Sequence, residues 1–377
     1  MVVEIGFGRH VITPSSRHWP IWLSGYGDRS EPATGVHDDL DVRVLVAREG
    51  ATTLALVALD LMAMSRDWAD SVRAGVAAEL GIAIDSVLTH TVHTHAAPST
   101  ITGTDALGWP VPHGWRDELV AACRSAASGA RASACPARLR FARLGLPAAL
   151  SFNRRSHPYL PTYAVLDVLE ADADVRVGTI ANIGVHPVVL GPQNRRVSAD
   201  WVGPCRSEIE RRLGGTALFL QGCQGDVDPH GMAWTEDSEA AFAAVQRVGE
   251  DLALAVVAAT AIATDAGGLG VRAQRRVLAL DVSGSPMAAI TRRDTLDVEL
   301  HEWSLDGVRI VTVPGEGFAG LGARIVASRQ GEPTLLCGFA PHWLGYLPVP
   351  FTDGYEEGLS YGEAAVDAIV RALETVP

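Results

Sequence analysis

The stretch TLALVALD (53–60), together with a helical pattern over 65–80 and the run VLTHTVHTHAAP (87–98), decides the predicted fold. Residues 53–60 are too continuously apolar to have a face in water, which is typical of a buried strand. The helical pattern begins after Ser65, a residue preferred at helix N-termini, and ends at Gly81. A buried strand, a helix and a second apolar run in this order predict an α/β sheet.

The same alternation continues on both sides of this stretch. Further strand-like runs occupy 41–48, 164–170, 176–185, 216–221 and 308–313, and further helical patterns occupy 116–132, 200–213, 237–262 and 361–374. From about 271, longer strands joined by turns such as Asp306-Gly307 predict an extra antiparallel layer. We therefore predict an α/β fold with a mixed sheet core, flanking helices and an additional antiparallel C-terminal layer. We expect one domain over 1–377, with a subdomain from about 271 to 377 left open, and we find no internal repeat in the sequence.

The composition limits the classes of function. With 377 residues, of which 47% are apolar and 20% charged, the chain can bury a full core without disulfide bonds. The formal net charge is -13 and no stretch concentrates arginines, so we expect no nucleic-acid partner. All 31 basic residues are arginine, which excludes Schiff-base, pyridoxal-phosphate and P-loop lysine chemistry.

The cysteines and the apolar segments indicate the compartment. The five cysteines are scattered and include no CxxC pair, which favours buried thiols in a reducing compartment. The N-terminus has no basic region followed by an apolar run, and the most apolar later segment, 252–263, is too short to span a bilayer. We therefore expect a cytoplasmic protein with no stable membrane association. A homo-oligomer is left open.

Three histidines follow strand-like runs. His93 and His95 lie two positions apart, so an extended backbone places both imidazoles on one side and His90 on the other. A later strand-like run also ends in a histidine, His186. Ligands of α/β sheets collect at the carboxyl ends of strands, so the histidines of both runs could share one site. Histidines that are hydrogen-bonded within the core are the ordinary alternative.

A carboxylate could complete such a site. Glu316, in VPGEGF (313–318), follows the apolar run 308–313 and lies between two glycines that allow the backbone to approach closely. Two histidines and a glutamate are an appropriate set of ligands for a catalytic zinc ion with open positions. A solvated turn is the ordinary alternative for Glu316.

Beyond these residues, the chain resembles the catalytic domain of neutral ceramidases, zinc-dependent amidases that cleave an N-acyl bond. The resemblance rests on short segments that occur in the same order along nearly the whole chain. They are GFGRHVITP (6–14), GYGDR (25–29), GVHDDLDVRVLV (35–46), HTHAAP (93–98), NRRS (153–156), GVHP (184–187), SADWVG (198–203), GCQGDVDP (222–229), PGEGF (314–318) and GYLPVPFTDGYEEG (345–358).

The resemblance implies two sets of site residues. The zinc ligands would be His93, His186, Glu316 and Tyr346, the last of them as a phenolate. The catalytic group would be His95, Arg154 and Tyr355. Asp228 stands where the family carries a serine, so a water activated by zinc is the expected nucleophile. We expect neither the family's C-terminal immunoglobulin-like domain nor its secretion signal here, and therefore expect a small soluble amide or lactam as substrate rather than membrane-embedded ceramide.

The same resemblance implies a division of labour in catalysis. His95 is expected to take the proton of the attacking water and return it to the leaving nitrogen. Arg154 and Tyr355 are expected to face the oxyanion of the tetrahedral intermediate.

Other residues are expected to support the site. Asp60, Asp200 and Asp226 follow apolar runs and could orient the zinc histidines, with helix caps or turns as an equal alternative. Tryptophans of the long loops could wall the substrate pocket, although plain packing is the ordinary role of each. They are Trp19, Trp22, Trp109, Trp115 and Trp343.

Two alternative functions remain open at this stage. A dinuclear metal phosphoesterase or esterase would use Asp226, Asp228 and His230 beside His186, and would hold two metal ions about 3.5–4 Å apart. A non-catalytic, zinc-stabilised binding module would hydrolyse nothing and would unfold on loss of its metal.

Overall fold

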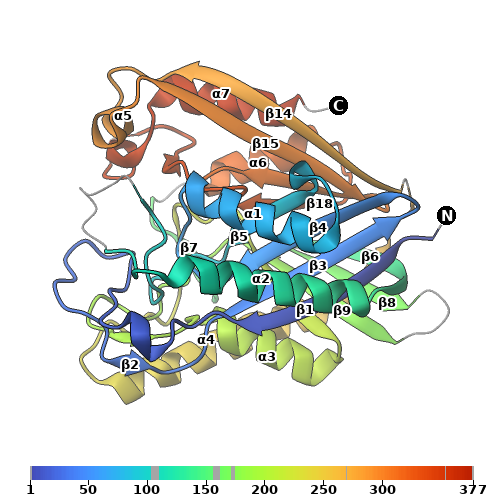
Figure 1. Cartoon of the computed structure of the whole chain (residues 1–377), viewed down its shortest axis with the longest axis horizontal. Helices are drawn as coiled ribbons and strands as arrows, with labels where there is room; N and C mark the ends of the chain where they lie inside the picture. The colour runs from blue at the N-terminus through green and yellow to red at the C-terminus, as the bar shows by residue number, and fades with distance from the viewer. Residues whose placement is uncertain are drawn as a thin grey trace.

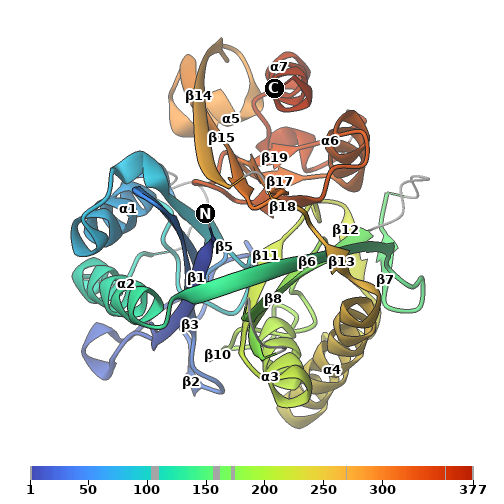
Figure 2. The ribbon, with the colours of Figure 1, turned by 90° about the vertical axis from the view of Figure 1, so that its right-hand side faces the viewer.

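Three sheet segments, two of which join into one nine-stranded sheet, surround one apolar core, and each segment carries helices on its outer face (Figure 2). The computed structural model describes residues 2–102, 110–155, 175–268, 270–352 and 354–375, and the backbone of 162–170. Along the chain, the sheets and their helices form three consecutive units, which follow one another from blue to red in Figure 1. The same order of elements recurs in each unit.

The first unit has four principal strands and two helices. The strands are β1 (Glu4–Val11), β3 (Asp41–Glu49), β4 (Thr52–Leu59) and β5 (Val87–Thr91). The pairs β1/β3 and β3/β4 are antiparallel, and β4/β5 is parallel. The helix α1 (Arg66–Leu80) makes the crossover from β4 to β5, and α2 (Trp115–Ala132) packs beside α1.

The second unit repeats this plan. Its strands are β6 (Cys135–Gly145), β8 (Thr162–Glu170), β9 (Arg176–Ile183) and β11 (Thr216–Gln221). Again the first two pairs are antiparallel and β9/β11 is parallel. The crossover helix is α3 (Val202–Leu213), and α4 (Ser238–Ile262) packs beside it. Two residue pairs between β1 and β6 join the sheets of the first and second units.

The third unit repeats it once more. Its strands are β14 (Val271–Asp281), β15 (Thr295–Leu305), β16 (Val308–Val313) and β18 (Thr334–Gly338), and its helices are α6 (Ala319–Ser328) and α7 (Glu363–Glu374). The pairs β14/β15 and β15/β16 are antiparallel, as predicted for this layer, but β18 is parallel to β16. A sequence without an internal repeat therefore folds into three topologically equivalent units.

Short elements complete the fold. The two-stranded pairs are β2 (Gly35–Val36) with β10 (Arg196–Val197), β7 (Ser151–Asn153) with β12 (Val227–Pro229), and β17 (Glu316–Gly317) with β19 (Tyr346–Leu347). One of them, β2 with β10, joins the first and second units. The remaining elements are β13 (Thr264–Asp265), α5 (Pro286–Thr291) and the single 3-10 turns Ser16–His18, Ile84–Ser86 and Glu357–Leu359.

Alternating side chains of the strands give each sheet two buried faces. The inner faces of all three sheets form one cluster, represented by Leu45, Leu56, Ile180, Leu218, Ile310 and Leu335. Each outer face packs against the helices of its own unit, for example Val44 and Val57 against Trp68 of α1. Strands that are buried on both sides need continuous apolar runs, which explains why their positions could be predicted from the sequence.

The predicted spans of strands and helices are confirmed to within a few residues, and the predicted helix ends are confirmed in part. Gly81 ends α1 with φ of 69°, a left-handed conformation that glycine adopts readily. Asp237 accepts from the backbone amides of Glu239 and Ala240 and so caps α4. The predicted role of Ser65 is wrong in one respect, because its hydroxyl donates to Asp67 and makes no cap hydrogen bond.

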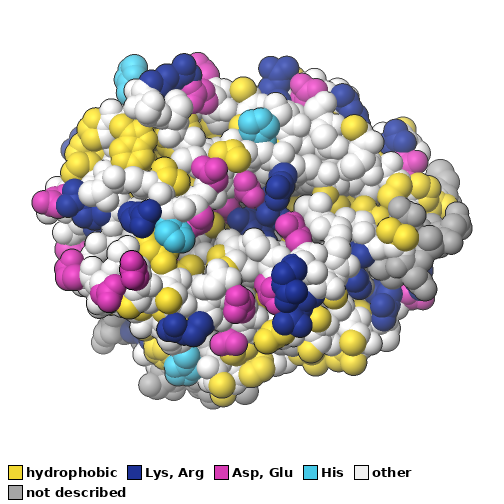
Figure 3. All heavy atoms as spheres, turned by 90° about the horizontal axis from the view of Figure 1, so that it is seen from below, with side chains coloured by type: hydrophobic (Ala, Val, Ile, Leu, Met, Phe, Trp, Pro, Cys, Tyr) yellow, Lys and Arg dark blue, Asp and Glu magenta, His cyan; other side chains and the backbone are white. Residues whose placement is uncertain are grey.

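One face of the molecule is mixed in charge. On the face shown in Figure 3, acidic and basic side chains are interspersed, and neither sign gathers over a broad area. In the described part of the chain, no helix combines the length and the apolar character needed to cross a bilayer.

Candidate metal centre

The end of β5 places the first imidazole. His93 follows the strand in a turn with a positive φ of 73°, and its side chain is almost completely buried. Its Nδ1 lies 2.9 Å from the carbonyl oxygen of Met62. Since a carbonyl oxygen only accepts, Nδ1 carries the hydrogen and Nε2 presents its lone pair to the cavity. A backbone contact therefore fixes both the tautomer and the orientation of His93.

The end of β9 places the second imidazole in the same way. The Nδ1 of His186 lies 3.2 Å from the carbonyl oxygen of Val227, and the backbone amide of His186 donates to the same oxygen at 3.0 Å. The Nε2 of His186 therefore also presents a lone pair. His186 is buried like His93, with an exposed fraction of 3%.

The segment after β16 brings the carboxylate of Glu316 between these imidazoles. Its Oε2 lies 3.3 Å from Nε2 of His93 and 3.6 Å from Nε2 of His186. The indole Nε1 of Trp343 donates to Oε1 at 3.1 Å. Burial raises the pKa of Glu316, whereas protonated rings of His93 and His186 would hold it well below its usual range. The glycines beside Glu316 are explained by close approach, since a Cβ at Gly315 would lie 2.3 Å from the carbonyl oxygen of Gly345.

His95 contributes a third imidazole. Its Nε2 lies 3.1 Å from Nε2 of His93, and its buried Nδ1 has no hydrogen-bond partner in the described part of the chain. Burial, His93 and His186 lower the pKa of His95 well below its usual range, so its ring is neutral. The shared side predicted for His93 and His95 is confirmed. His90 is directed elsewhere, with its Nδ1 2.7 Å from the carbonyl oxygen of Gly338.

These groups fit a metal ion. His93, His95 and His186 each offer a ring nitrogen, and the three atoms lie within 4.8 Å of one another. For metal–nitrogen bonds of about 2.0–2.1 Å, a tetrahedral site places neighbouring ligand atoms about 3.3 Å apart, which is close to the distances among His93, His95 and Glu316. The Oε2 of Glu316 is buried without a hydrogen-bond partner, and the Nε2 atoms of His93 and His186 face it with lone pairs rather than hydrogens. A cation between these atoms would give the carboxylate oxygen and the two ring nitrogens a common partner.

Two tyrosines lie beside Glu316. The short strands β17 and β19 are parallel, and their register places Tyr346 opposite Glu316. The rings of Tyr346 and Tyr355 make an edge contact, with 5.9 Å between their centroids, and the two phenols are hydrogen-bonded. Burial and then Glu316 raise the pKa of Tyr346 well above its usual range, so formation of a phenolate depends on a nearby cation.

Arg154 is held from several sides. Its Nη1 donates to Asp228 at 3.0 Å, its Nη2 donates to the hydroxyl of Tyr355 at 3.1 Å, and its Nε donates to Glu356 at 3.2 Å. All three nitrogens of the guanidinium have protein partners, and Arg154 lines the cavity together with Tyr355. The predicted role of Arg154 at the oxyanion stays a prediction.

All seven predicted site residues line one cavity of about 420 Å³. They are His93, His95, Arg154, His186, Glu316, Tyr346 and Tyr355. The structure thus brings together side chains from all three units and from the segments between them, while the role of each remains a prediction.

The expectation that three aspartates orient the histidines is wrong. Backbone carbonyls of Met62 and Val227 occupy the Nδ1 atoms instead. Asp60 forms a buried ion pair with Arg206, Asp200 accepts from backbone amides of 189, 190 and 201, and Asp226 accepts from Asn153 and from the first residue of α6. The aspartates therefore hold the loops that carry the site rather than the imidazoles themselves.

The dinuclear alternative finds no support in the geometry. Within the described residues, only His93, His95 and His186 gather closely enough to form a three-ligand group. Both carboxylate oxygens of Asp226 accept from other groups, and His230 is exposed and stacks near Phe152.

Several residues of the cavity were not predicted from the sequence. Tyr26, Asp28 and Trp234 line it, and Arg29 holds their loop by donating to the carbonyl oxygen of His95 at 2.6 Å. The segment GYGDR could have indicated this loop, because Gly25 is a glycine where the loop packs against His95. A Cβ at Gly25 would overlap the ring of His95. Of the predicted wall tryptophans, only Trp343 lines this cavity among those that the structure describes; Trp109 lies outside the described residues.

No protein-family model matches the chain, and none of the curated proteins matches it. Solved structures do match. Neutral ceramidase from Pseudomonas aeruginosa superimposes with a TM-score of 0.83 at 17% sequence identity, covering 99% of this chain and 74% of that one. A ceramidase complexed with C2 superimposes with a TM-score of 0.81 at 16% identity and the same coverage. At this identity the likeness concerns the fold, and it confirms the fold that the motif resemblance implied.

Proposed function

We propose that this chain is a zinc-dependent amidohydrolase that cleaves the amide bond of a small soluble substrate, an N-acyl amine or a lactam. The observation that carries the proposal is the convergence of three imidazole nitrogens and an unsatisfied carboxylate oxygen at one cavity. The likeness of the fold to ceramidase structures supports an amide rather than another bond as the target.

The residues that would hold the ion are His93, His186 and Glu316, with Tyr346 alongside. Nitrogen and oxygen donors of this kind suit zinc. Zinc bound there would polarise the scissile carbonyl and lower the pKa of a bound water to about 7. The carbonyl oxygens of Met62 and Val227 accept from Nδ1 of the two histidines, so the neutral form of each ring presents the lone pair of Nε2 to the proposed ion.

His95 is suited to move protons at the site. Its ring is neutral in this environment and lies beside the predicted ligands, so Nε2 can accept the proton of the attacking water and deliver it to the leaving nitrogen. The edge contact of Tyr26 with the ring, at 4.9 Å between centroids, helps to hold it in place.

Tyr355 is suited to stabilise the oxyanion. Because Arg154 donates to its hydroxyl oxygen, the hydrogen of Tyr355 can be donated to the substrate. Asp228 and Glu356 hold the Arg154 guanidinium in place. Arg154 therefore acts as a positioning residue for Tyr355.

The cavity favours a compact substrate. Its volume of about 420 Å³ includes the space around the predicted metal position, and Tyr26, Trp234 and Trp343 form aromatic walls. Such walls suit the apolar part of an acyl group, while Asp28 offers a polar group on the same cavity.

The test combines metal analysis with a substrate screen. The purified protein should contain about one zinc ion per chain and hydrolyse at least one member of a panel of N-acyl amines, lactams and esters. Chelation should abolish turnover, and added zinc should restore it. The matched control is His230→Ala, which removes an exposed histidine outside the cavity and should keep both metal and activity. Absence of any bound divalent metal, with no hydrolysis after zinc is supplied, would sink the proposal.

A further inference from the structure

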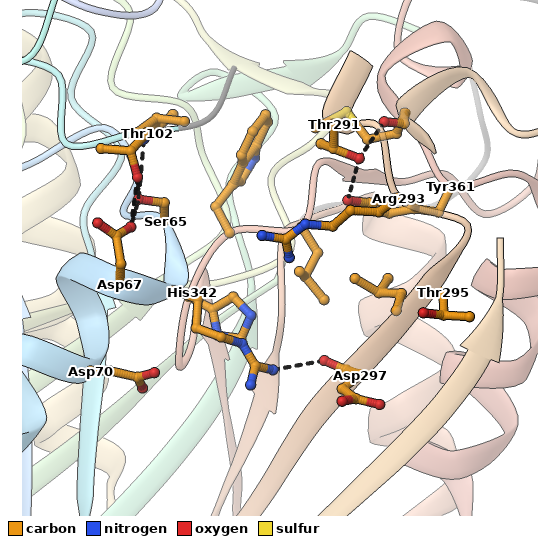
Figure 4. A pocket seen from close by; sticks show the side chains of 16 residues that line it. Ser65, Asp67, Asp70, Thr102, Thr291, Arg293, Thr295, Asp297, His342 and Tyr361 are labelled. Atoms are coloured by element: carbon orange, nitrogen blue, oxygen red, sulfur yellow. Dashed lines mark hydrogen bonds between the residues drawn. The ribbon is translucent and has the colours of Figure 1, made fainter. Parts of the chain in front are cut away.

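A second and larger cavity lies on the other side of Trp343. Its volume is about 590 Å³, and it opens between the start of α1 and the start of β15. Figure 4 shows Ser65, Asp67 and Thr102 on one wall and Thr291, Arg293 and Tyr361 on the opposite wall. None of the seven predicted metal and catalytic residues contributes to it, so this cavity needs its own explanation.

Two arginines on different elements line this polar cavity without a carboxylate partner. Arg66, at the first position of α1, donates Nη2 to the backbone carbonyl oxygen of Asp297 at 2.7 Å. Arg293, just before β15, points into the cavity in Figure 4. Arg66 is half-buried and Arg293 is exposed, and neither guanidinium forms an ion pair with any residue that the structure describes. Both therefore have N–H groups available for a ligand.

A buried histidine lies between them. His342 has an exposed fraction of 3%, lines the cavity, and forms no hydrogen bond with the described residues. Burial and then Arg66 lower the pKa of His342 to about 3, so the ring is neutral and has one N–H to donate. This N–H has no partner among the described residues, so His342 can donate to an acceptor that is bound in the cavity.

The carboxylates of the cavity are largely committed to other groups. Asp67 accepts from Ser65, from Thr102 and from Arg116, and Asp70 lies 3.4 Å from Arg73. Asp297 is exposed at the edge of the cavity.

The start of α1 lies on the same wall. No side chain caps the N-terminus of this 15-residue helix, but Asp67 in its first turn already places a negative charge beside the helix start. The two arginines, rather than the helix start, therefore supply the positive charge for a ligand.

We propose that this cavity binds a small molecule through a carboxylate or phosphate group, with Arg66 and Arg293 as the paired cations and His342 as a neutral donor. Guanidinium groups suit both oxyanions because their N–H groups match two oxygens at once. The site is separate from the proposed metal centre, but it shares the wall residue Trp343, whose indole holds Glu316.

The test is calorimetric titration of the purified protein with two probes, inorganic phosphate and succinate, at constant ionic strength. At least one should bind with one equivalent per chain. Binding of phosphate alone or of succinate alone identifies the recognised group. A proposed metal centre could also attract these anions, so the titration is repeated after the metal has been removed by chelation and dialysis. Binding should survive this treatment.

Variants locate the bound anion. Arg66→Gln and Arg293→Gln should each weaken binding at least about ten-fold, which corresponds to about 1.4 kcal/mol. Arg272→Gln is the matched control, because Arg272 is an exposed arginine of β14 outside the cavity, and it should bind as the unaltered protein does. Equal thermal unfolding of the three variants excludes loss of fold. The proposal is overturned if neither probe binds below about 10 mM, if binding disappears with the metal, or if the two cavity variants match the control.

Discussion

The first and second units have the same topology but use equivalent strand ends differently. In the second unit the third strand, β9, is followed by His186, whose ring nitrogen faces the proposed metal position. In the first unit the third strand, β4, is followed by Asp60, which makes a buried two-point ion pair with Arg206 of the second unit, at 2.7 and 2.6 Å. The equivalent ends of β4 and β9 therefore have different roles. His186 at the end of β9 belongs to the proposed metal centre, whereas Asp60 at the end of β4 attaches the first unit to the second.

Similar attachments join the other units. Arg73 of α1 forms a buried ion pair with Glu299 of β15 at 2.9 Å, linking the first and third units. Arg143 of β6 donates to the backbone carbonyl oxygen of Thr334 in β18, linking the second and third. Buried polar pairs of this kind fix one relative arrangement of packed elements, and here that arrangement sets the distances between the donors of the cavity.

The largest effect is expected at the end of β9, where His186 faces the proposed metal position. His186→Ala should remove the bound zinc and lower kcat/KM at least about a thousand-fold, because an activated water requires a complete set of ligands. Metal analysis and amide turnover measure both quantities. Retained metal at wild-type stoichiometry would show that β9 does not serve the centre.

The sequence was sufficient to predict the elements and part of this centre. Continuous apolar runs identified the strands, and strand-end position singled out His93, His186 and Glu316. Tyr346 was reached only through family resemblance, since the two-residue strands β17 and β19 leave no periodic signal. The orientation of the imidazoles could not be predicted, because backbone carbonyls fix it and every residue carries one.

The next largest effect should distinguish the roles of His93 and His95, the two histidines after β5. His95→Ala should lower kcat about 10²- to 10⁴-fold while the protein retains zinc, if His95 transfers protons. His93→Ala should instead release the metal. Parallel zinc analysis of the two variants distinguishes these roles. Loss of zinc from His95→Ala would make His95 a ligand, a role its distance of 3.1 Å from His93 Nε2 also allows.

A substitution of Asp60, at the end of β4, should change the stability of the protein rather than its metal content. Asp60→Asn leaves Arg206 buried without a charged partner and should lower the free energy of unfolding by about 3–5 kcal/mol. Urea denaturation measures this change, and zinc stoichiometry at low temperature should stay near one. Asp297→Asn, at an exposed position, is the control and should change stability by about 0.5 kcal/mol or less. Loss of zinc together with stability in Asp60→Asn would show that the ends of β4 and β9 do not differ in role.

The smallest effect concerns the group that holds Glu316. Trp343→Phe removes the indole donor to Oε1 while keeping an aromatic wall, and should weaken zinc binding about 10- to 100-fold. Competition with a chromophoric chelator measures the affinity. An unchanged affinity would mean that the backbone of β17 alone positions the carboxylate.

The origin of the donors in three successive units has a consequence for biosynthesis. Glu316 and Tyr346 belong to the last unit, so translation completes the histidine pair of the first unit long before these oxygen donors exist. The three imidazoles lie in the first two units, so the complete set of nitrogen and oxygen donors exists only after the third unit has been synthesised. Loading of the proposed ion with all of its donors would then report on a fully assembled polypeptide.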